Sequence, residues 1–92
     1  MFSHVMLGAN NIEESKEFYD QILAVLGARP GKLSLNHDGH TRYVYFVNNK
    51  NSFIISQPIN NEKASHGNGA TIGFNASSTD MVDKWYEAGK NV

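Results

Sequence analysis

The feature that most constrains the fold is an amphipathic helix with defined ends that follows directly on a strand-like stretch. Residues 2–9 alternate between two faces as a strand does. Asn11 can act as the N-cap of the helix, and Glu14 stands three positions later, as in a capping box. Apolar residues then recur near helical spacing as far as Leu26, and Gly27 suits the position that stops a helix. This order favours an α+β fold.

Three more strands are expected after the helix. The first is short and centred on residues 33–35, and Asp38-Gly39 predicts a hairpin turn after it. Residues 42–48 are β-branched and aromatic, as in a strand. An Asn-rich turn over 48–51 leads to a buried strand over 52–57, which Pro58 ends.

The remaining residues resemble the beginning of a second, similar unit. Residues 59–69 are polar and Gly-rich, and predict a loop. Residues 70–76 predict another strand, followed by N-cap side chains over 77–80. A helix is expected over 81–88, with Gly89 ending it. We therefore expect a single domain over 1–92, made of a βαβββ module (1–58), a linker (59–69) and the start of a second module (70–92).

Composition excludes several classes of protein. The 92 residues carry a formal net charge of -1, with Lys and Arg scattered singly, so nucleic-acid binding has no electrostatic support. The sequence contains no cysteine, which excludes disulfides, thiolate metal sites and cysteine nucleophiles. No apolar run is long enough to span a membrane. The first residues lack the basic start of a signal peptide, so a cytoplasmic protein is expected.

Several motifs together resemble the glyoxalase/bleomycin-resistance/dioxygenase family, the vicinal oxygen chelate superfamily. The opening Phe-Ser-His-Val-Met-Leu-Gly leads to a helix motif, Ser-Lys-Glu-Phe-Tyr, that runs on to Leu26-Gly27. Residues 53–58 resemble the fourth strand of the family, and residues 67–74 the start of its second module. The resemblance spans essentially the whole chain. It implies a glyoxalase-like βαβββ module followed by the strand and helix of an incomplete second module.

The resemblance also implies a site for one divalent metal in a cup built from two modules. The usual ligands are a His in the first strand, a Glu late in the fourth, a His in the fifth and a Glu in the last. His4 matches the first position, and imidazole nitrogen is a favoured ligand. The fourth strand has no carboxylate, and only Gln57 could offer an oxygen there.

The other ligand positions are not matched. The fifth-strand position falls on Ala70 or Thr71, and the sequence stops before the strand that would bring the last Glu. His66 lies nearby in a loop, where solvent exposure is the simpler interpretation. His37-Asp38-Gly39-His40 could hold a metal, but a hairpin turn explains these residues as well. A mononuclear metal site of the family type is therefore not expected in one chain.

Aromatic residues are the other candidates for binding a small molecule. Tyr43 and Tyr45 share one face of their strand, and Val44 and Phe46 share the other. We expect Val44 and Phe46 to pack in the core. The predicted ligand cavity consists of Tyr43, Tyr45, Phe53 and Thr71.

The short second module leaves an unpaired strand edge and a partly uncovered last helix. Exposed strand edges favour pairing with another chain, so a homodimer is expected. A short natural protein, a truncated gene product and a fragment of a longer protein all remain open.

Three functions are weighed: a metal-free small-molecule binder, which the missing ligands favour; a metal-dependent lyase, isomerase or dioxygenase completed by a second chain; and a fold relic or interaction module without a ligand. Whether the chain is an enzyme stays undecided, because fold alone does not establish chemistry.

Overall fold

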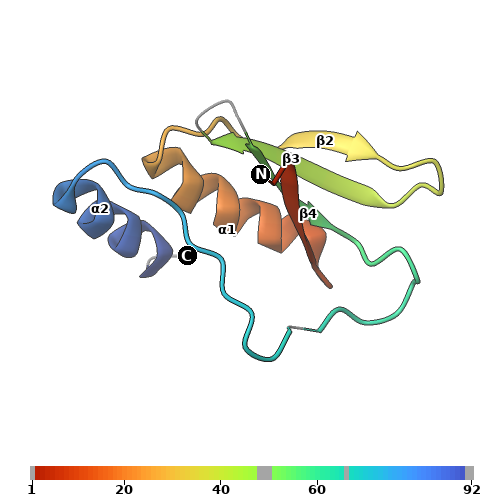
Figure 1. Cartoon of the computed structure of the whole chain (residues 1–92). Helices are drawn as coiled ribbons and strands as arrows, with labels where there is room; N and C mark the ends of the chain where they lie inside the picture. Colours follow the sequence, from red (N-terminus) through yellow and green to blue (C-terminus); the bar gives the residue numbers. More distant parts are fainter. Residues whose placement is uncertain (1, 48–50, 66, 91–92) are drawn as a thin grey trace.

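A computed structural model describes residues 2–47, 51–65 and 67–90 of the chain (Figure 1). Its elements follow in the order β1 (His4–Gly8), α1 (Ile12–Val25), β2 (Lys32–Leu35), β3 (Thr41–Val47), β4 (Asn51–Ser56) and α2 (Thr79–Lys90). The strands form one mixed sheet in the order β1-β4-β3-β2. β1 runs parallel to β4, and the other neighbours are antiparallel. The predicted βαβββ module is therefore present, within an α+β fold.

The two ends of α1 form as the sequence predicts. The side chain of Asn11 accepts a hydrogen bond from the backbone N–H of Glu14 at 3.1 Å and donates one to its carboxylate at 3.1 Å. At the other end, Gly27 has a φ of 96° and donates to the carbonyl of Ala24. Ala28 donates to the carbonyl of Leu23, which completes a Schellman motif. These caps fix the residues at which α1 begins and ends.

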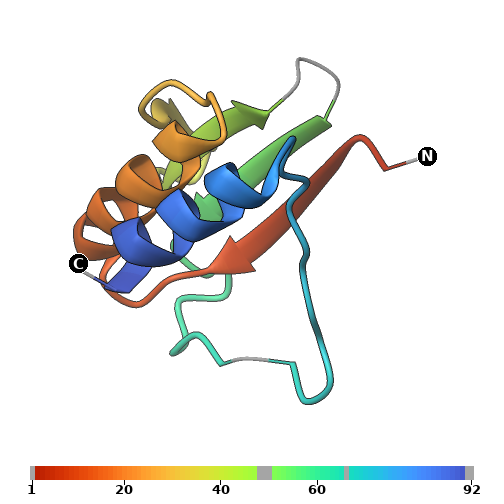
Figure 2. The ribbon, with the colours of Figure 1, turned by 90° about the vertical axis from the view of Figure 1, so that its left-hand side faces the viewer.

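Both helices lie on the same side of the sheet, and the core sits between α1 and the sheet (Figure 2). The helix contributes Ile12, Ile22 and Leu23, which are all less than a tenth exposed. α2 contacts α1 and, among the described elements, no strand. It buries none of its described residues fully, and Val82 is 49% exposed on it.

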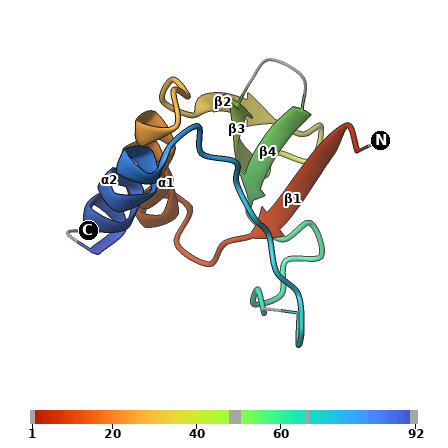
Figure 3. The same ribbon diagram turned by 60° about the vertical axis from the view of Figure 1, so that its left-hand side comes forward.

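Two expectations about the last third of the chain are wrong. Residues 70–76 form no strand; they run past the edge of the sheet near β1 without pairing (Figure 3). A strand needs a partner for its backbone groups, and this segment pairs with no described strand, although β1 beside it is an edge of the sheet. Gly89 does not end the last helix, since α2 continues to Lys90. An ideal Cβ at Gly89 would lie 3.5 Å from a methyl group of Ile22, so the glycine stands where the two helices meet.

The assignment of Val44 and Phe46 to the core is also wrong. Tyr43 and Tyr45 are the residues that face α1, at 8% and 1% exposure. Phe46 is 56% exposed on the other face of the sheet, and Val44 lies beside it half-buried. Alternation along the strand identifies two faces but not which of them a helix covers. Here both faces carry large apolar side chains.

Candidate functional site

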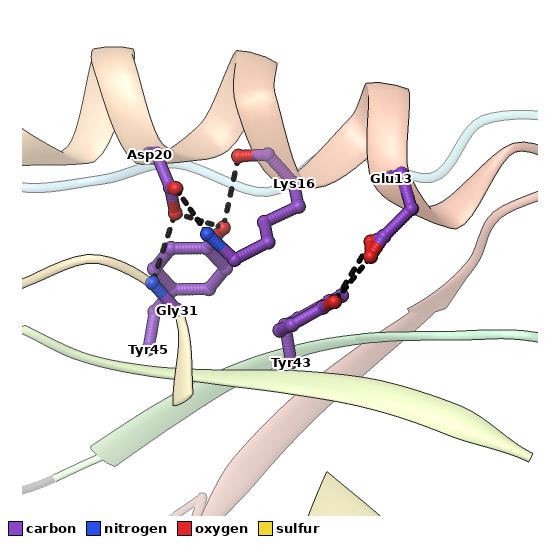
Figure 4. Close-up of polar contacts among 6 residues, drawn as sticks. All are labelled: Glu13, Lys16, Asp20, Gly31, Tyr43 and Tyr45. Atoms are coloured by element: carbon purple, nitrogen blue, oxygen red, sulfur yellow. Dashed lines mark hydrogen bonds and ion pairs between the residues drawn. The ribbon is translucent and has the colours of Figure 1, made fainter. Parts of the chain in front are cut away.

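Tyr45, one of the four predicted cavity residues, is held in the core by a polar contact with α1 (Figure 4). Its hydroxyl donates to Oδ1 of Asp20 at 2.7 Å, with the carbonyl of Lys16 at 3.2 Å. Burial, and then the hydrogen bond to Asp20, raises the pKa of the Tyr45 hydroxyl well above its usual range. Tyr45 therefore stays neutral and joins the sheet to the helix.

Asp20 collects further donors at the same place. Its Oδ1 accepts the backbone N–H of Gly31 at 2.9 Å, and its Oδ2 lies 2.5 Å from Nζ of Lys16 (Figure 4). Burial alone would raise the pKa of the Asp20 carboxyl. The hydrogen bonds and the charge of Lys16 outweigh that effect and hold the pKa below its usual value. Asp20 thus ties together α1, the connection to β2, and β3.

Tyr43 makes a second tether of the same kind. Its hydroxyl donates to the carboxylate of Glu13, with Oε2 at 2.7 Å, and Nζ of Lys16 lies 5.3 Å from the centre of its ring (Figure 4). The hydrogen bond to Glu13, followed by burial, raises the pKa of Tyr43. The structure therefore places Tyr43 and Tyr45 beneath α1, with their hydroxyls already occupied, and not on an open cavity wall.

Phe53, the third predicted cavity residue, borders the larger of two hollows along β1. This hollow, called here the aromatic hollow, has a volume of about 640 Å³ and lies between α1, β1, α2 and residues 64–74. Phe53 meets Tyr19 at 4.9 Å and Phe74 at 5.3 Å between ring centres. The aromatic residues that line the aromatic hollow are Phe18, Tyr19, Phe53, Phe74 and Trp85. Ser15 and Asn10 add polar groups at its margin.

A smaller hollow, of about 190 Å³, lies beside the start of β1 and contains His4. It is called here the edge hollow, and its lining includes His4, Ser52, Ile72 and Asn75. Nδ1 of His4 lies 2.9 Å from the hydroxyl of Ser3, and no described residue binds Nε2. Phe53, Ile72 and Phe74 border both hollows, so the two are adjacent. Thr71, the fourth predicted cavity residue, is exposed, and its neighbours Ala70 and Ile72 both line the aromatic hollow.

The two predicted metal ligands are not brought together. His4 lies opposite Ser52 in the parallel register, whereas Gln57 follows the far end of β4. Five residues of strand correspond to about 16 Å. Gln57 also belongs to the alternate set of side chains, and its amide oxygen already accepts the backbone N–H of Thr41 at 2.9 Å. His4 and Gln57 therefore cannot bind one ion in a single chain.

The other histidines do not supply the missing ligands. Asn36 holds the predicted hairpin, because its side chain accepts the backbone N–H groups of Asp38 and His40. His40 directs Nε2 to Oδ1 of Asn61 at 2.9 Å and Nδ1 to Asn36. His66 lies outside the described residues. Within the ranges that the structure describes, no three side chains of His, Cys, Asp or Glu are placed to hold a metal ion. These residues do not fit the mononuclear centre that the family implies.

The face of the sheet opposite the helices is not covered by any described helix (Figure 3). The strand register arranges its side chains in three rows. The row at the start of β1 holds His4, Ser52 and Phe46; the middle row holds Met6, Ile54, Val44 and Lys32; and the last row holds Gly8, Ser56, Arg42 and Ser34. Met6 is 46% exposed and Phe46 56%. We call this set of residues the uncovered face.

Sequence reasoning missed four aromatic residues of the aromatic hollow, Phe18, Tyr19, Phe74 and Trp85. Of these, Phe74 lies in the segment expected to form a strand, and Trp85 lies in the expected last helix. Both line the hollow because residues 70–76 pass beside β1 and α2 packs against α1. The only available signal was an aromatic residue in each of the two segments, which indicates burial but not which element each would meet.

Comparison with known proteins agrees with the fold. A family profile described as the Glyoxalase/Bleomycin resistance protein/Dioxygenase superfamily matches residues 1–90. The crystal structure of a glyoxalase/bleomycin resistance protein from Albidiferax ferrireducens T118 is similar over 99% of this chain and 70% of that one, with 45% sequence identity and a TM-score of 0.86. The chain therefore belongs to the glyoxalase/bleomycin-resistance/dioxygenase superfamily. No curated protein matches it.

Neither helix among the described residues has the length and apolar character that crossing a lipid bilayer requires.

Proposed function

We propose that the chain binds a small, largely apolar or aromatic molecule in the aromatic hollow, without a metal ion of its own. The observation that carries this proposal is the hollow itself. Its volume of about 640 Å³ falls within the range of roughly 300–1,000 Å³ that is usual for ligand sites. Aromatic rings border it on several sides, and Ser15 and Asn10 add a few polar groups. Such a lining suits a flat molecule that stacks on Phe or Tyr rings.

The residues at the metal-ligand positions of the superfamily favour binding of a small molecule over metal-dependent catalysis. Only His4 matches the metal-binding pattern of the superfamily, and the described chain brings no other ligand beside it. An isolated imidazole holds a divalent ion poorly, because structural and catalytic sites combine three or four protein ligands. We propose that His4 contacts the ligand or the solvent at the edge hollow.

A direct test uses the single tryptophan of the sequence. Trp85 lines the aromatic hollow, so its indole N–H gives one signal in a ¹H–¹⁵N spectrum that reports on this site alone. We expect titration with 2-naphthol to shift this signal in a saturable way. Ser15→Phe should fill the hollow and weaken binding at least about 5-fold, whereas Gln21→Phe, at an exposed position of the same helix, should leave it unchanged. A linear shift without saturation, or equal binding by both variants, would contradict the proposal.

We also propose that two copies of the chain associate. β1 is one edge of the described sheet, and the uncovered face beside it carries exposed Met6 and Phe46. Free strand edges and apolar faces favour association. Multi-angle light scattering at micromolar concentration should give twice the mass of 10.2 kDa. A stable, folded monomer under these conditions would rule the dimer out.

The cysteine-free sequence is compatible with the cytoplasm, the location that we propose. Cell fractionation that recovers the protein with the membrane or outside the cell would contradict it.

A further inference from the structure

The sequence has one Asn-Gly pair, Asn68-Gly69, and it forms an exposed turn in the connection between β4 and α2 (Figure 1). The backbone N–H of Ala70 donates to the carbonyl of Gly67 at 3.0 Å, which closes the turn around the pair. Gly69 has a φ of 88°, as at the third position of a type II turn. Such a pair is chemically reactive where its groups are free, because the backbone nitrogen of the glycine can attack the side-chain amide of the asparagine.

Both groups that would react are free in this turn. Asn68 is exposed, and its side-chain amide makes no hydrogen bond to any described residue. The backbone N–H of Gly69 is not part of the bond that closes the turn, and it has no acceptor in the described chain. A Cβ placed on Gly69 would meet no atom within 4 Å, so the backbone here is open to water and hydroxide. Most backbone N–H groups of a folded chain lack this access, because they are paired.

No other pair in the described ranges meets these conditions. Asp38-Gly39 also lies in a turn, but Gly39 donates its N–H to the carbonyl of Asn36 at 3.0 Å. Asn75 has no hydrogen-bonded side chain, yet Ala76 follows it, and the Cβ of alanine hinders an approach that glycine permits. Hydrogen bonds hold the side chains of Asn10, Asn11, Asn36, Asn60 and Asn61.

The reaction expected of such a pair is deamidation, which needs only water. The nitrogen of Gly69 gives its proton to hydroxide and attacks Cγ of Asn68. The N–Cγ bond forms as the Cγ–Nδ2 bond breaks, and the amide nitrogen takes a proton from water and leaves as ammonia. Water then opens the cyclic imide at Cγ to give aspartate, or at the main-chain carbonyl to give isoaspartate. Either product is a carboxylate at neutral pH, so the formal net charge of -1 falls by one further unit.

The new charge arises at the margin of the aromatic hollow. Gly67 and Ala70, whose backbone groups close the turn, both line this hollow. None of the described residues that line it is an Asp, Glu, Lys, Arg or His. A carboxylate beside this lining therefore acts on a bound molecule without a lining cation that offsets it.

We propose that Asn68 is a site of spontaneous deamidation, and that the carboxylate formed there disfavours anionic molecules in the aromatic hollow. The first step, the chemical conversion, is independent of the function proposed above. The second step rests on that function, because it requires an aromatic molecule to bind in the hollow. Modification of one surface residue thereby shifts the hollow toward neutral ligands.

Peptide mapping by mass spectrometry measures the conversion. Trypsin releases residues 64–84 as one peptide that contains both Asn68 and Asn75, so the second asparagine is an internal control. After incubation of the folded protein in mildly alkaline buffer, we expect aspartate and isoaspartate at position 68 and an unchanged Asn75. The rate should lie within about 3-fold of the rate in chain unfolded with guanidinium chloride, since the folded turn leaves both groups free. Gly69→Ala should slow the reaction.

Two results would overturn this step. Conversion at position 68 that is confined to the unfolded chain would mean that the folded turn protects the pair. Equal conversion of Asn75 would mean that the reaction depends neither on the glycine nor on this turn.

Asn68→Asp carries the charge of the product from the start and measures its effect on the hollow. The indole N–H signal of Trp85 is followed at pH 7 during titration with 2-naphthol and with the anionic 2-naphthoate. We expect Asn68→Asp to weaken binding of 2-naphthoate about 2- to 5-fold relative to 2-naphthol. Gln21→Glu, which adds the same charge at an exposed position of α1 outside the lining, should not.

An equal effect of the two variants, or no effect of Asn68→Asp, would overturn the second step. A wild-type chain that binds neither compound would refute the proposed function and the second step with it. The mass spectra decide the conversion in either case.

Discussion

Replacing Asp20 with alanine tests how firmly α1 is attached to the sheet. The carboxylate of Asp20 accepts from Tyr45, Gly31 and Lys16 at 2.5–2.9 Å. The Tyr45 hydroxyl would retain only a long contact of 3.2 Å with the Lys16 carbonyl, and the N–H of Gly31 would lose its acceptor. A buried donor left without a partner costs about 1–3 kcal/mol.

Asp20→Ala is therefore expected to lower the free energy of unfolding by about 2–4 kcal/mol. Two donors lose their acceptor, one of them only half-buried, and the helical ion pair with Lys16 adds about 0.3–0.5 kcal/mol. A chain of 92 residues has a free energy of unfolding on the order of 5–14 kcal/mol, so the loss is a large share. Urea denaturation at pH 7 measures it. Glu17→Ala, an exposed change on the same helix, should stay within about 0.5 kcal/mol.

The same variant has a defined pH dependence. In the folded protein the pKa of Asp20 lies below its ordinary value, so its contribution is fully present above the unfolded pKa of about 3.9. That contribution disappears as the pH falls through the lower, folded pKa. We expect the difference between wild type and Asp20→Ala to be constant from pH 7 to about 5 and to shrink below about pH 4. A loss below about 1 kcal/mol at pH 7, or a difference that is unchanged at pH 3, would refute the reasoning.

Other substitutions probe the caps, the core and the metal question. Gly31→Ala should destabilise the fold by about 1–3 kcal/mol in urea denaturation, because the new Cβ would lie 2.7 Å from Cζ of Tyr45. An unchanged free energy of unfolding would show that the Tyr45 ring can move aside. Leu23→Ala removes a side chain with 0% exposure and should cost about 2–5 kcal/mol, and a loss under 1 kcal/mol would contradict this packing. Asn11→Ala should cost about 1 kcal/mol through loss of the N-cap, as thermal denaturation would show. Mass spectrometry of protein purified without added metal should find less than stoichiometric metal in wild type and no change in His4→Ala; a stoichiometric metal that is lost in the variant would restore the enzyme hypothesis.

The sequence was sufficient where local chemistry decides the structure. The N-cap at Asn11 and the glycine stop at Gly27 formed as predicted, because the contacts that fix them lie within five residues along the chain. The hairpin at Asp38-Gly39 formed for the same reason, with Gly39 at a φ of 85°. Together with the motifs of the superfamily, these local signals predicted the βαβββ module.

The sequence was insufficient where distant segments decide the structure. The side chains of residues 70–76 suit a strand, yet strand formation needs a neighbour that propensity does not supply. Alternation along β3 also did not show which of its two faces packs against α1. In the structure, the hydroxyls of Tyr43 and Tyr45 donate to carboxylates on α1, and their face is the one that the helix covers. Arg42 stood in an apolar strand without any motif, so only the register showed that it shares a face with His4 and Lys32.

The strand order has a consequence for how the chain acquires its fold. β2, β3 and β4 are joined by short connections and pair with their neighbours in sequence, so their contacts can form early. β1 pairs with β4 alone among the described strands, and its register joins Val5 to Phe53. During synthesis, β1 and α1 leave the ribosome before β4, the strand that pairs with β1. We therefore expect the amides of β1 to gain protection from hydrogen exchange after those of the β2–β3–β4 meander, although β1 is synthesised before these three strands.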